Sequence, residues 1–323
     1  MTDAAEVEGE PTTRSPTVVA VGAATLDRTY AVTNLPEADG GAYARAVTDH
    51  HGGVGANVAV GCARLGRETG LLARLGPDDV GDRVAADIDA SPVDDARVRV
   101  APGTTTHCVI LRDDAGERTI VTAGDSTRRL RLDDRDEAYL RGADAVFVTA
   151  YVPDAVAARL ADLAADPSFP PLAVDLSGPL AELRDRGTEP ATLDRLCRVA
   201  SLFVAGTVAA ESYLDRPVAE APATLRDRGV DRGAVTRGAD GATLFTAEKE
   251  LSVPAFDVSV TDTTGAGDAF TAGLLDRWLL DGADPRAAGR WAAASAALNC
   301  RAAGARGSLP TAADVRSFLA ARE

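Results

Sequence analysis

One segment, Asp262 to Asp268 (sequence DTTGAGD), joins a glycine-bearing turn to a carboxylate and leads into an apolar run. Its glycines predict a helix N-terminus whose free backbone N–H groups face an anion, with the helix dipole behind them. The negative charge of Asp268 would repel that anion, so a carboxylate at this position indicates a chemical role. It can accept the proton of an attacking hydroxyl. The alternative is a helix start capped by Asp268, because Asp is a common N-cap residue. For this segment alone, capping is the better-supported interpretation.

Three further segments carry polar side chains beside glycines or strand ends. Asp27 comes just beyond the first predicted strand, where open α/β sheets bind ligands, although an Asx turn would also explain it. Gly52 to Asn57 (GGVGAN) is a glycine-rich helix entry with one polar side chain, and a tight turn before a packed helix accounts for it equally well. Thr236 to Gly241 (TRGADG) places glycines at another strand end.

The pattern of apolar residues predicts a doubly wound α/β fold that would position these groups. Residues 17–22 form a continuous apolar run, which is typical of a buried parallel strand. After residue 140, strands alternate with helices, which predicts a mostly parallel sheet covered by helices. Four earlier β segments do not alternate with helices and predict a small β-sheet lid over the strand ends. These segments are 29–34, 43–49, 107–112 and 118–123. Helices are expected at 56–65, 154–165, 190–198, 208–214, after Asp268 and at 286–302.

Composition limits the classes of partner. Only 4% of the 323 residues are aromatic against 46% hydrophobic, so the core consists mostly of Ala, Val and Leu. The formal net charge of -15 argues against nucleic acid and anionic membrane as partners, since both require a basic surface. The Asp-rich, Lys-poor composition resembles that of proteins from extremely halophilic archaea, whose cytosol is rich in potassium chloride. This resemblance concerns habitat and not fold.

Several familiar sites are excluded by the residues present. Lys249 is the only lysine and lies in AEKE, so the chain has no P-loop. The first strand is not followed by G-x-G-x-x-G, which argues against a nicotinamide-dependent oxidoreductase. The four cysteines are scattered, which argues against zinc ligation and disulfides. Without a secretory or membrane-spanning segment, the protein is expected to be cytoplasmic. Residues 1–16 are expected to form a mobile acidic tail before a single domain at 17–323.

The chain resembles the ribokinase-like (phosphofructokinase-B type) carbohydrate kinases. The resemblance rests on Asp27 and on the segments GGVGAN, TRGADG and DTTGAGDAF, which occur in this order. The resemblance extends from about residue 17 to 315, and DTTGAGDAF is its most specific motif. It implies a doubly wound α/β domain with a small β lid, whose strands would lie at about 28–50 and 104–123. It also implies an ATP-dependent enzyme that phosphorylates a hydroxyl group.

The resemblance implies a role for each segment. Asp268 would be the general base, and the amides of Gly265, Ala266 and Gly267 would form the anion hole for the transferring phosphoryl group. Sugar hydroxyls would be bound by Asp27, Gly53 and Asn57, while Thr236, Gly238 and Gly241 would line the ATP site. Because phosphoryl transfer depends on positioning and charge stabilisation, amides, helix dipole and Mg²⁺ can replace the absent lysine.

Two cations are implied in the same way. A monovalent cation, expected to be K⁺, would be bound by Asp262, Thr264, Asn299, Ala302, Gly304 and Ser308, mostly through backbone carbonyls. Mg²⁺ would be placed through water by Glu211, the second residue of the family's Asn-x-x-Glu pair. Val208 stands where the Asn is expected, so metal placement departs from the family pattern.

The expected acceptor is a neutral sugar of the pentose or ketohexose class. Val54 stands where ribose-specific members often have Lys, which weakens ribose itself as the candidate. A nucleoside kinase is disfavoured because the lid segments contain only two aromatic residues, Tyr30 and Tyr43. A phosphosugar kinase stays open because Arg45, Arg112 and Arg118 are available. A non-catalytic nucleotide-binding regulator is the alternative from another class. The family also makes a homodimer through the lid an expectation.

Overall fold

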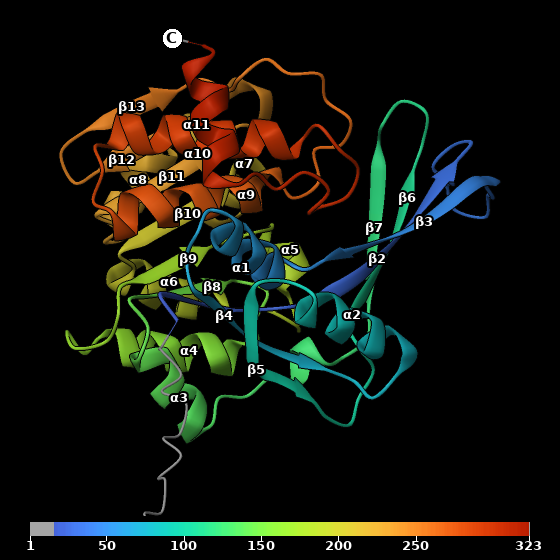
Figure 1. Ribbon diagram of the computed structural model, residues 1–323, viewed down its shortest axis with the longest axis horizontal. Helices are drawn as coiled ribbons and strands as arrows, with labels where there is room; N and C mark the ends of the chain where they lie inside the picture. The colour runs from blue at the N-terminus through green and yellow to red at the C-terminus, as the bar shows by residue number, and fades with distance from the viewer. Residues whose placement is uncertain (1–15, 323) are drawn as a thin grey trace, which may run out of the picture.

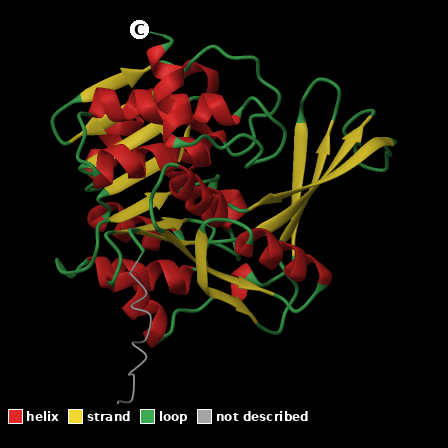
Figure 2. Cartoon of the chain, in the orientation of Figure 1, coloured by secondary structure: helices red, strands yellow, loops and turns green. Residues whose placement is uncertain are grey.

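The structure is a computed structural model that describes residues 16–322 (Figure 1). The expected tail at 1–16 therefore lies almost entirely outside the described residues. The chain forms one large layered α/β body and a β-sheet that projects from its side (Figure 2). None of the helices within residues 16–322 combines the length and apolar character that a membrane span requires.

The central layer, within residues 16–322, is a nine-stranded sheet in the order β13-β12-β11-β10-β9-β8-β1-β4-β5. All neighbours pair in parallel except β12, which is antiparallel to both β11 and β13. This confirms the predicted mostly parallel sheet. Its strands are β1 Val18–Val21, β4 Thr69–Leu75, β5 Val93–Val100, β8 Ala145–Thr149, β9 Leu172–Asp175, β10 Leu202–Gly206, β11 Arg232–Thr236, β12 Ala242–Thr246 and β13 Glu250–Val253.

Alternation along each strand divides the core into two layers, because successive side chains of a strand point to opposite faces. In β1, Val18 and Ala20 pack into one layer and Val19 and Val21 into the other, all fully buried. On the first side lie α1 Val54–Arg64, α2 Asp79–Asp89, α9 Ala266–Leu274, α10 Pro285–Asn299 and α11 Ala312–Ala320. On the second lie α3 Asp134–Arg141, α4 Asp154–Ala164, α6 Pro190–Val199, α7 Thr207–Leu214 and α8 Ala221–Asp227. The remaining helical segments within residues 16–322 are a short helix, α5 Leu180–Leu183, a π-helical turn, Leu275–Leu280, and three 3-10 turns, Thr127–Arg129, Val218–Glu220 and Gly238–Asp240.

The predicted lid is the projecting sheet at the right of Figure 1. Its strand order within the described residues is β3-β2-β6-β7, with β2 parallel to β6 and the outer pairs antiparallel. The first two strands are longer than expected, so Asp27, which does follow the end of β1, lies within β2 and not in the connection between the two strands. The strands are β2 Thr25–Val32, β3 Ala44–Gly52, β6 His107–Arg112 and β7 Arg118–Ala123.

Strand–helix alternation begins earlier than the sequence analysis indicated. β4, α2 and β5 follow the lid's first hairpin and extend the main sheet beyond β1. The signal was weak because α2 has few apolar residues and β5 is interrupted by Asp94 and Asp95. The strand order reverses at β1, since the chain adds β4 and β5 on one side and β8 onward on the other. Ligands bind at the carboxyl ends of strands at such a switch point.

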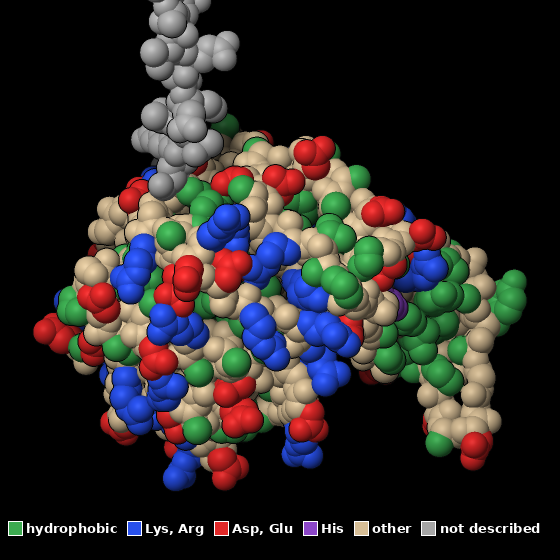
Figure 3. All heavy atoms as spheres, turned by 90° about the horizontal axis from the view of Figure 1, so that it is seen from below, with side chains coloured by type: hydrophobic (Ala, Val, Ile, Leu, Met, Phe, Trp, Pro, Cys, Tyr) green, Lys and Arg blue, Asp and Glu red, His purple; other side chains and the backbone are tan. Residues whose placement is uncertain are grey.

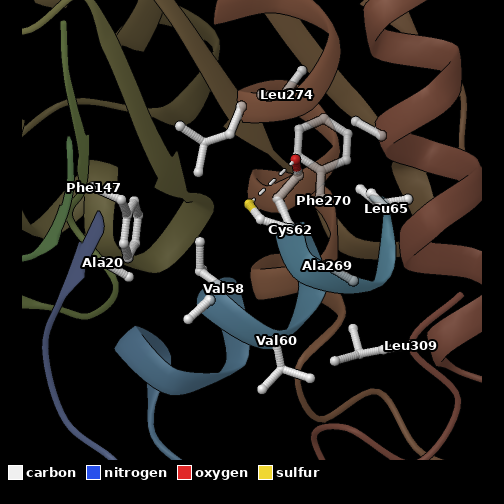
Figure 4. Close-up of a cluster of buried hydrophobic side chains, with 14 of the residues drawn as sticks. Ala20, Val58, Val60, Cys62, Leu65, Phe147, Ala269, Phe270, Leu274 and Leu309 are labelled. Carbon is white, nitrogen blue, oxygen red and sulfur yellow. Dashed lines mark hydrogen bonds between the residues drawn. The ribbon is translucent and has the colours of Figure 1, made fainter. Parts of the chain in front are cut away.

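Two parallel helices of the first layer, α1 and α9, pack closely side by side (Figure 4). A Cβ added at Gly61 would lie 2.9 Å from Cβ of Ala272, so the small residues of α1 permit this approach. The Cys62 thiol donates to the carbonyl of Ala272 over 3.9 Å. One turn nearer the two N-termini, the same contact line reaches Asn57 and Asp268. The packing of α1 on α9 therefore determines how these two polar side chains meet.

Candidate active site

Asp268 and Asn57 form a buried pair at the N-terminal ends of α9 and α1. Asn57 Nδ2 donates to Asp268 Oδ2 over 2.7 Å, and the two residues are 4% and 9% exposed. Burial raises the pKa of Asp268 to about 6, although the hydrogen bond from Asn57 and the charge of Arg306 oppose the rise. A carboxylate with this pKa is ionised near neutral pH yet basic enough to accept a proton.

Asp27 contributes a second buried carboxylate from the first residues of the lid. It accepts a hydrogen bond from Thr25 Oγ1 over 2.8 Å, and burial raises its pKa. A Cβ at Gly52 on the paired strand would lie 2.0 Å from Asp27 Oδ2, so only glycine leaves room for this carboxylate. The negative charge of Asp27 in turn raises the pKa of Asp268. The two predicted carboxylates therefore act on each other across one site.

The turn before α9 has the form expected of an anion-binding helix end. Gly265 is the N-cap residue with φ 75°, and a Cβ there would lie 2.2 Å from the carbonyl oxygen of Ala305. Within the described residues, the N–H groups of Gly265, Gly267 and Asp268 have no hydrogen-bond acceptor. The N–H of Ala266 instead donates to Thr263 O over 3.2 Å. The free amides therefore differ from the predicted set, with Asp268 N–H taking the place of Ala266 N–H.

A cavity of about 530 Å³ adjoins this turn and contains the predicted ATP-site residues. Thr236, Gly238 and Gly241 line it together with Ala266 and Gly267 of the helix end. The rest of its wall is mostly apolar and includes Phe256 and Phe270 along with Ala and Val side chains. An apolar cavity that opens onto free amides suits a ligand with a flat ring and an anionic tail.

The residues expected around K⁺ lie in the loop before α9, at the last residue of α10 (Asn299) and in the loop that follows α10. Asp262 Oδ2 accepts from Gly304 N over 3.0 Å, and Asn299 Nδ2 donates to the carbonyls of Thr264 and Ala305 over 3.2 and 3.1 Å. Burial would raise the pKa of Asp262, but hydrogen bonds from Gly304 and Thr264 hold it below its usual value. Asn299 Oδ1 is buried without a hydrogen-bond partner. An ionised carboxylate and an unsatisfied amide oxygen suit a monovalent cation. Ala302 and Ser308 lie in the same loop as Gly304.

Glu211, the residue expected to place Mg²⁺, lies on the exposed side of α7, and its Oε1 accepts from Val218 N over 3.0 Å. Val208 on the same helix is 66% exposed. Within residues 16–322, no three His, Cys, Asp or Glu side chains cluster as a metal cage. Mg²⁺ in kinases is commonly held by one or two carboxylates together with substrate phosphates, so such a cage is not required.

The sequence analysis missed two residues of this site. Asp175 ends β9, and burial together with the charge of Asp268 raises its pKa to about 7, although Ser177 N–H donates to it over 2.8 Å. It follows a buried apolar run, which is the signal that had singled out Asp27. Arg306 donates from Nε to Asn57 Oδ1 over 2.8 Å. It lies within the segment assigned to the cation, and no local sequence pattern there distinguishes an arginine of the site from a surface arginine.

Comparison with known proteins identifies the family of the chain. Residues 15–312 match the pfkB family carbohydrate kinases. The chain is 36% identical over 309 residues to an ATP-dependent ribose-1-phosphate kinase of Halopiger xanaduensis, covering 94% of this chain and 98% of that protein. It is 25% identical over 312 residues to the ribokinase of Bacillus subtilis, covering 94% and 99%.

Solved structures share the fold. Arabidopsis thaliana ribokinase complexed with ribose and ATP superposes with a TM-score of 0.82 at 25% identity, covering 94% of this chain and 99% of that one. The shared fold and the family match over residues 15–312 agree. The chain therefore belongs to the pfkB family of carbohydrate kinases and is an ATP-dependent enzyme of that family.

Proposed function

We propose that the protein transfers the γ-phosphoryl group of ATP to a hydroxyl of a pentose- or ketohexose-class sugar, with Asp268 as the general base. The observation that carries this proposal is the Asn57–Asp268 pair, which lies beside free amides at the N-terminus of α9. The sugar would be bound between Asp27 and Asn57. The adenine and ribose of ATP would occupy the cavity lined by Thr236, Gly238 and Gly241.

The chemistry follows from the charges at this point. The acceptor hydroxyl oxygen attacks the γ-phosphorus while its proton passes to the Asp268 carboxylate. The bond between the γ-phosphorus and the bridging oxygen breaks, and ADP leaves with that oxygen. The N–H groups of Gly265, Gly267 and Asp268 would face the negative charge on the transferring group, where fixed donors are most effective. Mg²⁺ would neutralise the phosphates, with Glu211 as the chain's candidate to orient its water.

A bound K⁺ would act on the anion hole through the loop that contains Asp262 and Thr264, because this loop leads directly into Gly265. Asp262, Thr264 and Asn299 adjoin Gly265 directly or through hydrogen bonds, so a cation bound there would hold the turn in place. Ala302, Gly304 and Ser308 would supply further oxygens from the loop after α10. This part of the proposal rests on the unsatisfied Asn299 oxygen and the ionised Asp262.

Substitution of Asp268 by Asn tests the base. We expect kcat to fall by about 10²–10⁴-fold while ATP binding persists, because a positioned base contributes that much. ADP release with sugar, ATP, Mg²⁺ and potassium chloride measures turnover. Glu248→Gln, an exposed carboxylate on the β12–β13 turn, is the matched control and should behave like the unsubstituted protein. Turnover of D268N at the unsubstituted rate would refute the assignment. ATP binding by the unsubstituted protein without turnover on any sugar would favour a regulator.

A phosphosugar acceptor is the second candidate, for two reasons. The relative at 36% identity is a ribose-1-phosphate kinase. In addition, Arg112 and Arg118 lie on the lid face that carries Asp27 and reach the loop before α9. Arg118 Nη1 donates to Thr264 Oγ1 over 2.9 Å, and Arg112 Nη2 to Thr261 O over 3.4 Å. Arg45, in β3, instead pairs with Asp114 in the turn between β6 and β7. Comparison of ribose with ribose 1-phosphate in the ADP-release assay decides between the two classes.

A nucleoside acceptor is less favoured because the lid offers no ring for a base. Tyr30 pairs with Val47 and Leu111 on the lid face opposite to Asp27, since the two residues are three positions apart on one strand. Tyr43 is 74% exposed near the lid tip. Neither ring is placed to stack over a sugar held by Asp27.

The outer lid surface supports the expected homodimer. Val47 and Val121 are half exposed on the face opposite to Asp27. Hydrophobic side chains gather at the lid side of the molecule in the view from below, whereas acidic and basic side chains alternate over the rest of that face (Figure 3). An exposed apolar sheet face is suited to a second copy of itself. Light scattering of Val121→Lys against the unsubstituted chain tests this, since a charge there should yield monomers.

A further inference from the structure

The guanidinium of Arg306 connects three separate parts of the chain behind the candidate base. Its Nε donates to Asn57 Oδ1 over 2.8 Å, its Nη2 to the carbonyl of Gly52 over 2.8 Å and its Nη1 to Asp87 Oδ2 over 2.5 Å. The side chain is only 11% exposed. Because each of the three nitrogens already has a protein acceptor, the group is built to hold neighbouring residues and not to capture a ligand.

The contact with Asn57 determines which end of that amide faces Asp268. Arginine has only donors, so it must meet the amide oxygen, Oδ1. The amide nitrogen, Nδ2, then points at Asp268 and donates to it over 2.7 Å. If the amide were reversed, its oxygen would face the carboxylate and its N–H groups would face the guanidinium. Both contacts would then be repulsive. Arg306 thereby removes one of the two orientations available to Asn57.

Asn57 consequently has little capacity left for a sugar. Its oxygen accepts from Arg306 and one N–H binds Asp268, which leaves one N–H and one lone pair of the amide. The predicted role of Asn57 in binding sugar hydroxyls is therefore joined by a second role, the support of the base. The charge of Arg306 acts in the same direction as the hydrogen bond, since both favour the ionised form of Asp268.

We infer that Arg306 is a positioning residue for phosphoryl transfer, which fixes Asn57 so that Asp268 stays ionised and aimed at the acceptor hydroxyl. The inference rests on the proposed role of Asp268 as the base. Asp87 completes the chain of contacts because it holds Nη1 and neutralises the buried guanidinium. The carbonyl of Gly52 ties the same guanidinium to the end of the lid strand β3.

Substitution of Arg306 by Ala, with kcat and KM measured across pH, tests this role. We expect kcat to fall by about 10- to 100-fold, because a displaced catalytic group loses rate steeply. KM for ATP should change little, since the ATP cavity does not include Arg306. The acidic limb of the kcat/KM profile should shift to higher pH by about one unit. Without Arg306, Asn57 is no longer fixed as the hydrogen-bond donor to Asp268, and Asp268 also loses a nearby positive charge. Added guanidinium ion should restore part of kcat.

Arg64→Ala is the matched control. Arg64 is a partly buried arginine that donates to Leu309 O of the same C-terminal loop but does not touch Asn57. The R64A substitution should lower the stability of the fold without shifting the acidic limb of the kcat/KM profile. If R306A fails to fold, as thermal unfolding would show, Arg306→Lys supplies the measurement, because it keeps the charge and loses the planar fork. A smaller movement of the limb is expected for R306K.

The outcomes separate this inference from the proposed function. An unchanged acidic limb and kcat in R306A, with a raised KM for the sugar, would overturn the inference and make Arg306 a substrate-binding residue. If D268N is inactive while R306A behaves in this way, only the role of Arg306 fails. If D268N keeps full turnover, the base assignment itself fails.

Discussion

Asn57 Nδ2 lies 2.7 Å from Asp268 Oδ2, although the two residues are 211 positions apart in the chain. Each follows a glycine-rich turn at the start of a helix, and the helices pack in parallel with their N-termini at the same end. Two helix dipoles therefore point their positive ends at one place. This geometry places free amides of a helix N-terminus beside a buried carboxylate.

Activity should depend on the ionisation of Asp268. Its pKa is raised to about 6 by burial, and only the carboxylate can accept the hydroxyl proton. We therefore expect kcat/KM to be half-maximal near pH 6 and to fall tenfold per pH unit below it. Initial rates in buffers of constant ionic strength measure this. A midpoint near 4 would mean that Asp268 is not desolvated in solution.

Asp175→Asn should stabilise the fold at neutral and alkaline pH. The carboxyl of Asp175 has its pKa raised from 3.8 to about 7 in the folded chain, so the folded state binds a proton that the unfolded state has released. Stability is then lost as pH rises from about 4 to 7. An Asn oxygen can still accept from Ser177 N–H. We expect a gain of roughly 2–4 kcal/mol at pH 8 that vanishes below pH 4.

Denaturant unfolding at pH 4 and pH 8 checks the Asp175 prediction. Asp166→Asn on the surface is the control, since the pKa of Asp166 is lowered by hydrogen bonds from Ser168. That substitution should show no gain at pH 8. An equal effect of Asp175→Asn at both pH values would indicate that packing, and not charge, is responsible.

Gly265 and Gly267 should respond differently to substitution by Ala. Gly265 has φ 75°, and its Cβ would meet Ala305 O at 2.2 Å, so Ala should destabilise the protein by about 2 kcal/mol or more. A Cβ at Gly267 meets nothing within 4 Å and would point into open space beside the cavity proposed to hold ATP. G267A should keep its unfolding temperature but bind ATP more weakly. Thermal unfolding and ATP titration of both variants make the comparison, and equal losses of stability would contradict it.

Potassium should activate the enzyme through Asn299. Its Oδ1 is buried without a partner, and its Nδ2 holds Thr264 and Ala305. In Asn299→Ala, the potassium concentration for half-maximal activity should rise by about tenfold. Ser295→Ala, one turn earlier on α10 and bonded only to Trp291 O, is the control. Rates that do not depend on potassium in the unsubstituted protein would remove the cation from the proposal.

Local signals in the sequence were enough for the fold class and for several of the residues that the structure brings together at the candidate site. Continuous apolar runs such as Val18–Val21 indicate buried parallel strands, because both faces of the strand are covered. The glycines of GGVGAN and DTTGAGD indicate where backbone must approach other atoms, and those turns do open α1 and α9. The sequence pattern did not predict β4, α2 and β5, because charged residues interrupt their apolar residues. In the folded protein, neighbouring elements bury the apolar residues that they do have.

The contacts within the site depended on tertiary structure. No spacing in the sequence relates Asn57 to Asp268 or brings Arg306 behind them, since these contacts arise from the parallel packing of α1 on α9 and from the return of the loop after α10. The raised pKa values of Asp175 and Asp268 likewise depend on burial, which the chain acquires only when the sheet and helices close over them. The sequence by itself determined which residues could do the chemistry. The fold decided which of them touch, because hydrogen bonds and desolvation act over a few ångströms of space and not along the chain.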